Sequence, residues 1–487
     1  MPSAILPNRP AVPDPVPVSK LDKKGEAAAK RRQKSPKQVA DAILGEMAEP
    51  NCFELGQLFA GLVQGPSGLV YGYNGRFWEP AGEATLARIA YLGDVAETGT
   101  TKRSRIGDIV SVLKAASYKH DLEFVRTADN EVPVRNGVVD VHTQKLRPHR
   151  KADWLDGVLP VDFDADAVAD DFMAAMQDWF GDPAAGIAMD DRANALVDFF
   201  GYVALPHARF KKALFLYGEG DSGKSVPLKL LRKFVGEAFS CSLGVEEMDD
   251  PVKRAVIRHK RLNVLTELSS DAMIRDGGFK TMVSTEEPLL LNPKYENPHT
   301  YVPIAKHVIA ANNLPQINDR SAATFNRLLP IPFTRVFEAH EQDEGLFKRL
   351  TTDAAMSGLL NLALVGAKRV IDRGGKFVTP RAGEILAHKM REESNPFYEF
   401  KAARLIADPL GFVRAGELVD EFNAWRKGAR KVDTRGIGKL ARQAGLEWGD
   451  IWNAVNGGND KGVKGWRLRV NTDGGEHLPA QGSGDFG

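Results

Sequence analysis

The sequence predicts an α/β fold at the centre of a multi-domain protein. Residues 206–340 alternate short apolar strands with helical segments, which is the pattern of a parallel sheet with crossover helices. The first apolar strand runs into "GEGDSGKS", which matches the glycine-rich pattern G-x-x-x-x-G-K-[ST]. A chain of 487 residues is long enough for about three domains. We therefore expect an α/β core at 206–340 with further domains on both sides.

Composition narrows the class of protein. The chain has 65 Lys and Arg against 64 Asp and Glu, and this net charge of +1 excludes a uniformly basic nucleic-acid coat. Its two cysteines, Cys52 and Cys241, exclude a disulfide framework and a cysteine-rich zinc site. No apolar run approaches the ~20 residues of a membrane span, and the N-terminus has no signal-peptide core. We expect a cytoplasmic protein without a membrane partner.

The residues before the α/β core divide into an arm and a domain. Residues 1–40 are rich in proline and basic side chains and predict a disordered arm. Residues 41–205 mix helical spacing with hairpin patterns and predict an α+β domain. Within it, Asp162, Asp164 and Asp166 alternate as metal ligands on a strand would. No partner cluster follows them, so a polar loop leading into a helix is the favoured interpretation.

The residues after the core predict three further segments. Residues 341–394 have helical patterns and read as a helical extension. Residues 395–470 read as helices followed by a terminal strand pair, which together would make a winged-helix-like domain. Four tryptophans are expected in the core of this C-terminal module: Trp425, Trp448, Trp452 and Trp466. The glycine-rich residues 471–487 predict a disordered tail.

The C-terminal module carries a local positive charge that the total hides. Residues 395–470 hold 14 Lys and Arg against 9 Asp and Glu, a difference of +5. Arg435, Lys439 and Arg442 are spaced by four and three residues, so a helix would place them on one face. Such a face can lie against the phosphates of duplex DNA, although a solvated basic helix has the same pattern.

The glycine-rich sequence predicts a phosphate-binding loop. Glycines at 218 and 223 allow backbone N–H groups to converge on phosphate oxygens, and the N-terminus of the following helix adds its positive dipole end. Lys224 would reach the β- and γ-phosphates, while the Ser225 hydroxyl would ligate Mg²⁺. The predicted nucleotide-binding residues are Gly218, Glu219, Gly220, Asp221, Ser222, Gly223, Lys224 and Ser225.

Two later strands end in residues that suit hydrolysis. "RLNVLTE" ends in Glu267, which could polarise water, hold Mg²⁺, or do both. Only one acid is present there, because Thr266 occupies the preceding position. "AKHVIAANN" ends in Asn312, which could lie between the first two strands and orient water against the γ-phosphate.

An arginine could complete a neighbouring subunit's site. Arg327 ends a short predicted helix just before a strand, where it would project from a subunit edge. A guanidinium in that place stabilises the charge that develops in phosphoryl transfer. Arg320 and Arg335 are the competing candidates.

In this order, the segments "GEGDSGKS", "NVLTE", "HVIAANNLP" and "FNRLLPIPF" resemble the superfamily 3 helicases, in their phage, plasmid and poxvirus primase–helicase branch. The resemblance covers roughly residues 118–340. It implies an AAA+-type ATPase core that binds ATP and Mg²⁺, assembles as a ring, usually a hexamer, and moves along single-stranded DNA. It maps the Walker A positions onto the loop around Lys224, the Walker B acid onto Glu267, the motif C asparagine onto Asn312 and the arginine finger onto Arg327.

The resemblance also implies contacts with DNA. Family members carry a basic residue and a pore hairpin between the Walker B acid and motif C. Lys280 matches the basic residue, and Lys294 and Tyr295 in "LNPKYENP" would form the hairpin tip. A cation and an aromatic side chain at a tip suit backbone tracking and base stacking on single-stranded DNA. The C-terminal winged-helix-like module would contact duplex or origin DNA.

The expected function is an ATP-dependent DNA helicase that acts in the replication of a phage, prophage or plasmid-like element, in the host cytoplasm if phage-encoded. The alternatives are an ATP-switched initiator that binds origin DNA without processive unwinding, and a remodeller that acts on protein. The pore hairpin disfavours the remodeller. We do not expect primase activity, because the region before the core is short and poor in a catalytic carboxylate set. A separate primase would then be a further partner.

Overall fold

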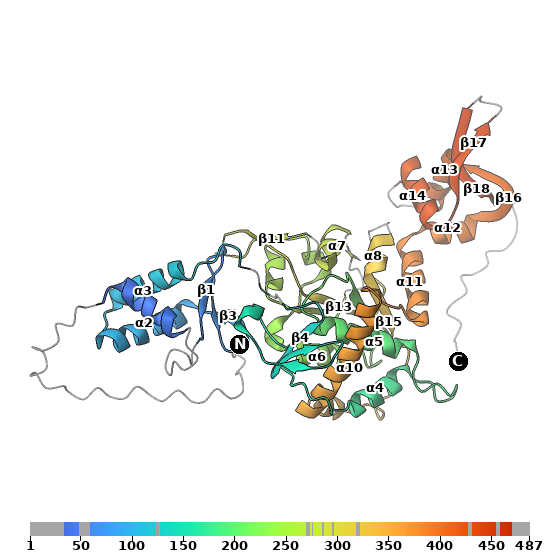
Figure 1. Cartoon of the computed structure of the whole chain (residues 1–487). Coiled ribbons are helices and arrows are strands. Elements are labelled where there is room, and N and C mark those ends of the chain that lie inside the picture. The colour runs from blue at the N-terminus through green and yellow to red at the C-terminus, as the bar shows by residue number, and fades with distance from the viewer. Residues whose placement is uncertain are drawn as a thin grey trace, which may run out of the picture. The chain divides into compact units, whose positions relative to one another are not determined.

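The computed structural model of the chain (Figure 1) forms two compact units, residues 1–72 with 80–120, and residues 73–79 with 121–487. The residues that the structure describes are 34–47, 59–122, 124, 127–268, 273–274, 276–284, 287–294, 297–317, 322–426, 431–453 and 458–469. Most of the expected N-terminal arm and all of the expected tail therefore lie outside the described residues.

The first unit is a small helical domain with a strand pair. It contains α1 (Pro36–Glu46), α2 (Glu83–Thr98), α3 (Arg103–Ala116), β1 (Leu62–Gln64) and most of β2 (Val70–Tyr73). Helix α1 begins at Pro36 because Ser35 caps it: the Gln38 amide donates to Ser35 Oγ (3.3 Å), and the Ser35 amide donates to the Gln38 side chain (2.8 Å). The expected arm boundary at residue 40 is therefore wrong, since this capped helix begins before it and packs Val39 and Ile43 into the core of the unit.

The second unit begins with short antiparallel strands and two helices. These are β3 (Trp78–Pro80), β4 (Glu131–Val134), β5 (Gly137–Asp140), β6 (Leu146–Arg147), α4 (Asp170–Phe180) and α5 (Asp191–Ala204). Asp162 forms an ion pair with Arg135 (2.6 Å), and the Asp166 amide donates to Asp164 Oδ1 (3.1 Å). This segment is thus a polar loop before α4, as predicted.

The expected single domain at 41–205 does not match the observed division, because the first unit ends at His120. Helices α4 and α5 share one hydrophobic core with the central sheet of the second unit, which joins residues 121–205 to that unit.

The centre of the second unit is a five-stranded parallel sheet, which confirms the predicted α/β class. Its order is β15 (Leu328–Pro332), β7 (Ala213–Tyr217), β13 (Lys306–Ala311), β9 (Leu262–Leu265) and β8 (Ser240–Cys241). Both faces of the sheet are covered, so most side chains of its strands are apolar. The buried polar exceptions include Asn263 of β9 and Lys306 and His307 of β13. In β7, Leu214 faces one hydrophobic cluster and Phe215 faces the other, because successive side chains of a strand point to opposite faces.

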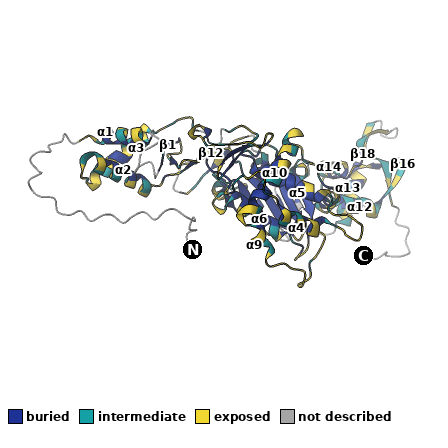
Figure 2. Ribbon diagram, turned by 60° about the horizontal axis from the view of Figure 1, so that its bottom comes forward, coloured by how far each residue is buried: buried dark blue, intermediate teal, exposed yellow. Residues whose placement is uncertain are grey.

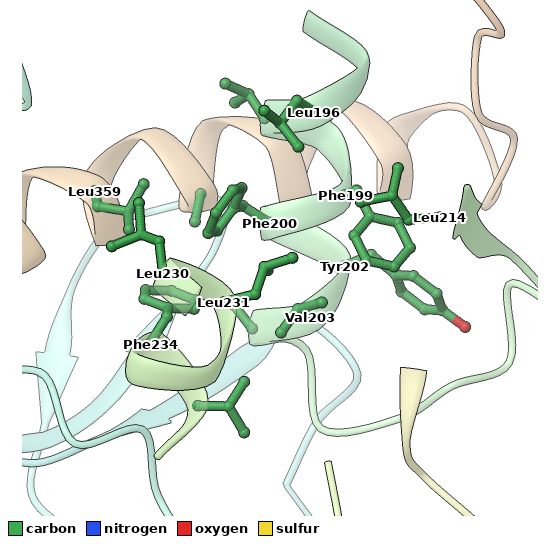
Figure 3. Close-up of a cluster of buried hydrophobic side chains, with 14 of the residues drawn as sticks. Leu196, Phe199, Phe200, Tyr202, Val203, Leu214, Leu230, Leu231, Phe234 and Leu359 are labelled. Atoms are coloured by element: carbon green, nitrogen blue, oxygen red, sulfur yellow. The ribbon is translucent and has the colours of Figure 1, made fainter. Parts of the chain in front are cut away.

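One face of the sheet is covered by α5, α6 (Ser225–Val235) and α10 (Asp353–Asp372). Figure 3 shows this cluster, with side chains of α5 and α6 meeting Leu214 of β7 and Leu359 of α10. The axes of α5 and α10 approach closely at glycines: a Cβ on Gly201 would lie 2.1 Å from the backbone of Ala367, and one on Gly366 would lie 2.3 Å from that of Val197.

Helix α10 is buried in this core (Figure 2) although it is long and apolar enough, by length and composition alone, to cross a membrane. Of its most apolar window, 56% is buried inside the structure, as in the core helix of a globular domain. A sequence pattern cannot separate the two cases, because both require a continuous apolar surface.

The remaining elements of the second unit lie outside the five-stranded sheet. The strands are β10 (Met273–Ile274), β11 (Leu289–Leu291), β12 (His299–Tyr301) and β14 (Gln316–Ile317). The helices are α7 (Asp276–Ser284), α8 (Ala322–Arg327), α9 (Leu346–Leu350) and α11 (Arg381–Ser394). The short 3-10 helices are η1 (Lys151–Asp153), η2 (Glu237–Phe239), η3 (Val245–Glu247) and η4 (Lys253–Ile257).

The C-terminal module has its own core and sheet. Its elements are α12 (Phe397–Arg404), β16 (Leu405–Arg414), α13 (Ala415–Trp425), α14 (Thr434–Gln443), β17 (Trp448–Asn453) and β18 (Gly458–Leu468), with sheet order β16-β18-β17. The expected helices and terminal strand pair are present, and β16 was not expected. Its register shifts between Ala407 and Phe412, around Pro409 and Gly411, and such residues ordinarily signal a turn.

Candidate nucleotide site

The glycine-rich loop joins the end of β7 to the start of α6, in the strand, loop, helix order that the sequence predicts. The backbone of Gly223 has φ 89° and that of Asp221 has φ 54°, so both lie in the left-handed region. Gly223 is also enclosed, since a Cβ there would lie 2.8 Å from Trp179 Nε1. A Cβ on Gly218 would lie 2.4 Å from the carbonyl oxygen of Phe333. Packing therefore requires glycine at both positions, and at Gly223 the positive φ requires it as well.

Lys224 is held inside the loop. Its side chain is 9% exposed, and Nζ donates to the carbonyl oxygens of Gly218 (2.7 Å) and Glu219 (2.5 Å) and to Ser222 Oγ (3.0 Å). Burial lowers the pKa of the Lys224 ammonium from its ordinary value, and the carboxylates of Asp221 and Glu219 oppose this shift. The loop thus presents a partly desolvated cation beside its backbone amides, which is a suitable environment for phosphate.

Two other predicted residues meet the loop at the same edge of the sheet. Strand β13 pairs in parallel with both β7 and β9, and the carboxyl ends of parallel strands lie together. Asn312 directly follows β13, so it lies between the other two strands, as expected. Glu267 is the second residue after β9, and both side chains are exposed. The sheet order therefore brings Lys224, Asn312 and Glu267 to one edge.

A cavity of about 270 Å³ lies beside the loop and was not anticipated from the sequence. It is lined by Asp171, Ala174, Ala175, Asp178, Trp179, Asp221, Gly223, Ser225, Val226, Phe337, Glu341, Gln342, Asp343, Glu344, Leu346 and Arg349. The apolar walls include Trp179 from α4, Val226 from α6 and Phe337 from the segment after β15. No local pattern announces this cavity, because its walls come from three separate stretches of the chain.

Two arginines tie the walls of the cavity together. Arg349 Nε lies 3.2 Å from Asp171 of α4, and its Nη2 lies 2.5 Å from Asp343. Arg335 Nη1 donates to the carbonyl oxygen of Asp178 (3.2 Å), also on α4. These contacts link α4 to the segment that follows β15, so the cavity has a defined shape.

The two described arginine-finger candidates lie at opposite ends of β15. Arg327 ends α8, just before β15, and β15 pairs with β7 in the register Leu328↔Ala213. Arg327 is therefore at the end of the edge strand away from the loop of its own subunit. Its Nη1 donates to the Ala323 carbonyl oxygen (3.0 Å), and its Nε is buried with no hydrogen-bond partner among the described residues. Arg335 follows β15 and lies at its own subunit's cavity, while Arg320 is outside the described residues.

The candidate DNA-binding residues belong to other elements than those of this edge. Strands β11 and β12 form the expected antiparallel hairpin, and Lys294 is exposed in its connection. Tyr295 of the same connection lies outside the described residues, and Lys280 lies on α7 with a partly exposed side chain. Three further candidates are exposed along α14: Arg435, Lys439 and Arg442.

Comparison with known proteins supports this description. Residues 216–327 match the model of a family of unknown function (DUF5906), and residues 65–182 match the model described as D5 N terminal like. The chain is 25% identical over 222 residues to "Putative helicase 121R" of Invertebrate iridescent virus 3, a match that covers 43% of this chain and 23% of the viral protein. The chain therefore spans about a quarter of the length of this relative.

The solved structures show a similar fold. The structure of the NrS-1 C terminal region without ligand is 12% identical, has a TM-score of 0.51, and is matched over 88% of this chain and 99% of that one. A second form of the same region has a TM-score of 0.49 at 11% identity, with the same coverage of both chains. Part of this chain is therefore similar in sequence to a viral protein described as a putative helicase and to the D5 N-terminal model, and the structural match supports its α/β fold.

Proposed function

We propose that this chain is an ATP-dependent DNA helicase of viral or phage replication, of the superfamily 3 type with an AAA+ core. The observation that carries the proposal is the order of the central sheet. It places the loop with Lys224, the end of β13 with Asn312 and the end of β9 with Glu267 on three adjacent strands. Phosphate binding, water positioning and metal binding require groups at one edge in this way.

The residues at the edge fit hydrolysis of a nucleoside triphosphate. Lys224 and the loop amides would bind the phosphates, and Asn312 would orient the attacking water. Ser225 at the start of α6 and Glu267 after β9 both have exposed side chains with oxygen donors, the ligands that Mg²⁺ prefers. When bound, Mg²⁺ would neutralise charge on the phosphate oxygens. The described residues contain no group of three His, Cys, Asp or Glu side chains suited to a metal, so phosphate oxygens and water would complete the coordination.

The cavity beside the loop would take the nucleoside of ATP. An adenine ring is flat and apolar on its faces, and Trp179, Phe337 and Val226 supply apolar walls. The carboxylates at the rim, among them Asp171 and Asp178, repel a triphosphate but accept hydrogen bonds from amino and hydroxyl groups. This distribution of charge favours the phosphates in the loop and the base in the cavity.

The protein would act as a ring, most simply a hexamer, with ATP hydrolysed between subunits. The position of Arg327 before the edge strand, away from its own loop, supports this proposal, because a neighbouring subunit could receive it there. A buried guanidinium nitrogen without a hydrogen-bond partner among the described residues fits a residue that completes its contacts in an assembly.

The DNA contacts would come from two places. The β11–β12 hairpin with Lys294 would enter the pore of the ring and follow single-stranded DNA. The C-terminal module has the element order helix, strand, helix, helix, strand, strand with the sheet order β16-β18-β17, which suits a winged helix. Its helix α14 would lie against duplex or origin DNA.

The decisive experiment measures ATP hydrolysis with and without single-stranded DNA, followed by strand displacement on a forked duplex. A helicase is stimulated by single-stranded DNA and separates the fork with ATP. ATP hydrolysis that does not change when single-stranded DNA is added, together with no strand displacement, would overturn the proposal that the protein is a motor. If ATP instead promotes binding to a specific duplex without displacement, the alternative holds, namely an ATP-switched initiator whose binding surface is α14. Primer synthesis is not part of the proposal, so a separate primase would be its partner, in the host cytoplasm.

A further inference from the structure

The C-terminal module exposes one large aromatic side chain. Trp452 of β17 is 65% exposed, although the sequence predicts it in the core. The other three tryptophans of the module, Trp425, Trp448 and Trp466, pack against its core. A lone indole of this size on a soluble surface loses the stabilisation of burial, so an external contact would account for it.

Trp452 lies on the face of the sheet that is turned toward α14. Residues two apart on a strand point to the same face, which places Trp448 and Trp452 together. Trp448 packs beneath α14, since a Cβ on Gly438 would lie 2.8 Å from its ring, and the Arg442 guanidinium lies 5.9 Å from the Trp448 ring centroid. Trp452 therefore lies on the same side of the module as α14, further along the β17–β18 pair.

The charge on this side is predominantly positive. Four other basic residues of the module form ion pairs: Arg404 with Glu421, Arg414 with Asp460, Lys464 with Glu447 and Arg467 with Asp408. On the side of α14, four basic residues have no ion pair among the described residues, three of them on α14 and one on β18: Arg435, Lys439, Arg442 and Lys461. One carboxylate, that of Asp450, lies on the same face, across from Lys461.

We propose that Trp452 stacks on the terminal exposed base where duplex DNA opens into a single strand, while the basic side chains of α14 bind the duplex phosphates. An indole offers a wide π-face to any base, and the surrounding cations complement a polyanion. A base face is free for stacking only at a break in the duplex stack, so the ligand is a fork rather than a continuous duplex. This inference rests on the proposed helicase function and adds a residue that would recognise the fork.

The test compares full-length wild type with Trp452→Ala and Trp452→Phe on a forked duplex and on a blunt duplex with the same base pairs. Trp452→Ala should weaken fork binding about tenfold and leave blunt-duplex binding within about twofold, while Trp452→Phe retains most of the affinity. The salt dependence of binding should stay unchanged, because no phosphate contact is lost. Ile451→Ala is the matched control, since Ile451 is the neighbouring exposed residue on the opposite face of β17.

The outcomes separate this inference from the proposed function. If ATP hydrolysis responds to single-stranded DNA but Trp452→Ala binds the fork as wild type does, the stacking role is wrong and the helicase proposal stands. Equal losses on fork and blunt duplex would also overturn it, because they would indicate a general contact. A change in the size of the assembly with unchanged DNA affinity would assign Trp452 to a contact between copies of the chain and overturn the proposal.

Discussion

The backbone amide of Gly218 donates a hydrogen bond to the carbonyl oxygen of Ala311 (3.3 Å), which joins the first residue of the glycine-rich loop to the residue before Asn312. The bond crosses from the end of β7 to the end of β13, two strands that pair in parallel. The main chain therefore holds the backbone of Asn312 at a fixed place beside the loop. Only the orientation of its side chain is left free to change.

Asn312→Ala should reduce turnover far more than affinity for ATP, because an amide that orients water contributes in the transition state rather than in binding. We expect kcat to fall about a hundredfold with KM within a few-fold of wild type. Steady-state hydrolysis at saturating single-stranded DNA gives both values. Asn313→Ala is the control, since Asn313 is the next residue and equally exposed. A variant of Asn312 with normal kcat would exclude this role.

Lys224→Ala should abolish ATP hydrolysis and the stabilisation that ATP gives to the fold. The ammonium is the buried cation of the loop, and it donates to three loop oxygens. Thermal unfolding with and without ATP and Mg²⁺ should show a nucleotide-dependent rise in Tm for wild type and none for the variant. Lys229→Ala, at an exposed position of α6, should behave as wild type. Retained turnover in Lys224→Ala would refute the site.

Mixing Arg327→Ala subunits with Lys224→Ala subunits should restore part of the ATP hydrolysis that each variant lacks alone. An intact loop from the first would meet an intact arginine from the second, if Arg327 acts across a subunit boundary. Arg327→Ala alone should lose about a thousandfold in kcat, as for other arginine fingers. As the matched control, Arg335→Ala subunits are mixed with Lys224→Ala subunits. This mixture should show no recovery of ATP hydrolysis, because Arg335 lies at its own subunit's cavity. Absence of recovery with Arg327→Ala would rule out the role in trans.

Ala174→Leu should raise KM for ATP about tenfold with little change in kcat, because the larger side chain fills part of the cavity where the base would bind. Ala174 is exposed on α4, so the substitution should leave the fold intact. Gln177→Leu adds an apolar side chain at another exposed position of the same helix that does not line the cavity. If both variants have the wild-type KM, the nucleoside does not occupy this cavity.

Stability should fall as the pH decreases from about 6.5 to about 4, in part through His307. Burial lowers the pKa of His307 from 6.5 to about 4. Its neutral ring is held at Nδ1 by Asn263 Nδ2 (3.2 Å) and at Nε2 by the Met282 carbonyl oxygen (3.3 Å). In this range the unfolded chain binds a proton that the folded chain refuses, so low pH favours unfolding by up to roughly 3 kcal/mol.

Urea unfolding of wild type and His307→Gln at several pH values measures this contribution. The variant should lose stability less steeply below pH 6.5. Its remaining slope belongs to the carboxylates and to other buried histidines, among them His207, whose pKa burial also lowers to about 4. Parallel slopes for the two proteins would show that His307 does not contribute. The comparison needs no absolute stability, because the difference between the two curves removes the other titrating groups.

Local chemistry allowed much of the site to be anticipated. A strand followed by glycines, lysine and serine is compatible with few backbone conformations. The loop with Gly223 at φ 89° has one of them. The expected place of Asn312 between two strands followed from strand ends alone. The exposure of Trp452 could not be anticipated, because a tryptophan in a short alternating segment is as compatible with a core as with a surface.

The cavity and the two arginines were decided only by tertiary structure. Trp179, Val226 and Phe337 come from α4, α6 and the segment after β15, and no pattern within one segment records that they meet. Arg327 and Arg335 are eight residues apart in similar surroundings, and only the direction of β15 separates them into opposite ends of the sheet.

The sequence by itself determined the α/β class, the glycine-rich loop between strand and helix, and the acid and amide at the strand ends, because these depend on short-range periodicity and backbone conformation. Tertiary structure decided the order of the strands, the cavity beside the loop, the division into units at His120 and the exposed face of the C-terminal module. These depend on which apolar surfaces far apart in the chain bury one another, and burial is a property of the packed molecule rather than of any single segment.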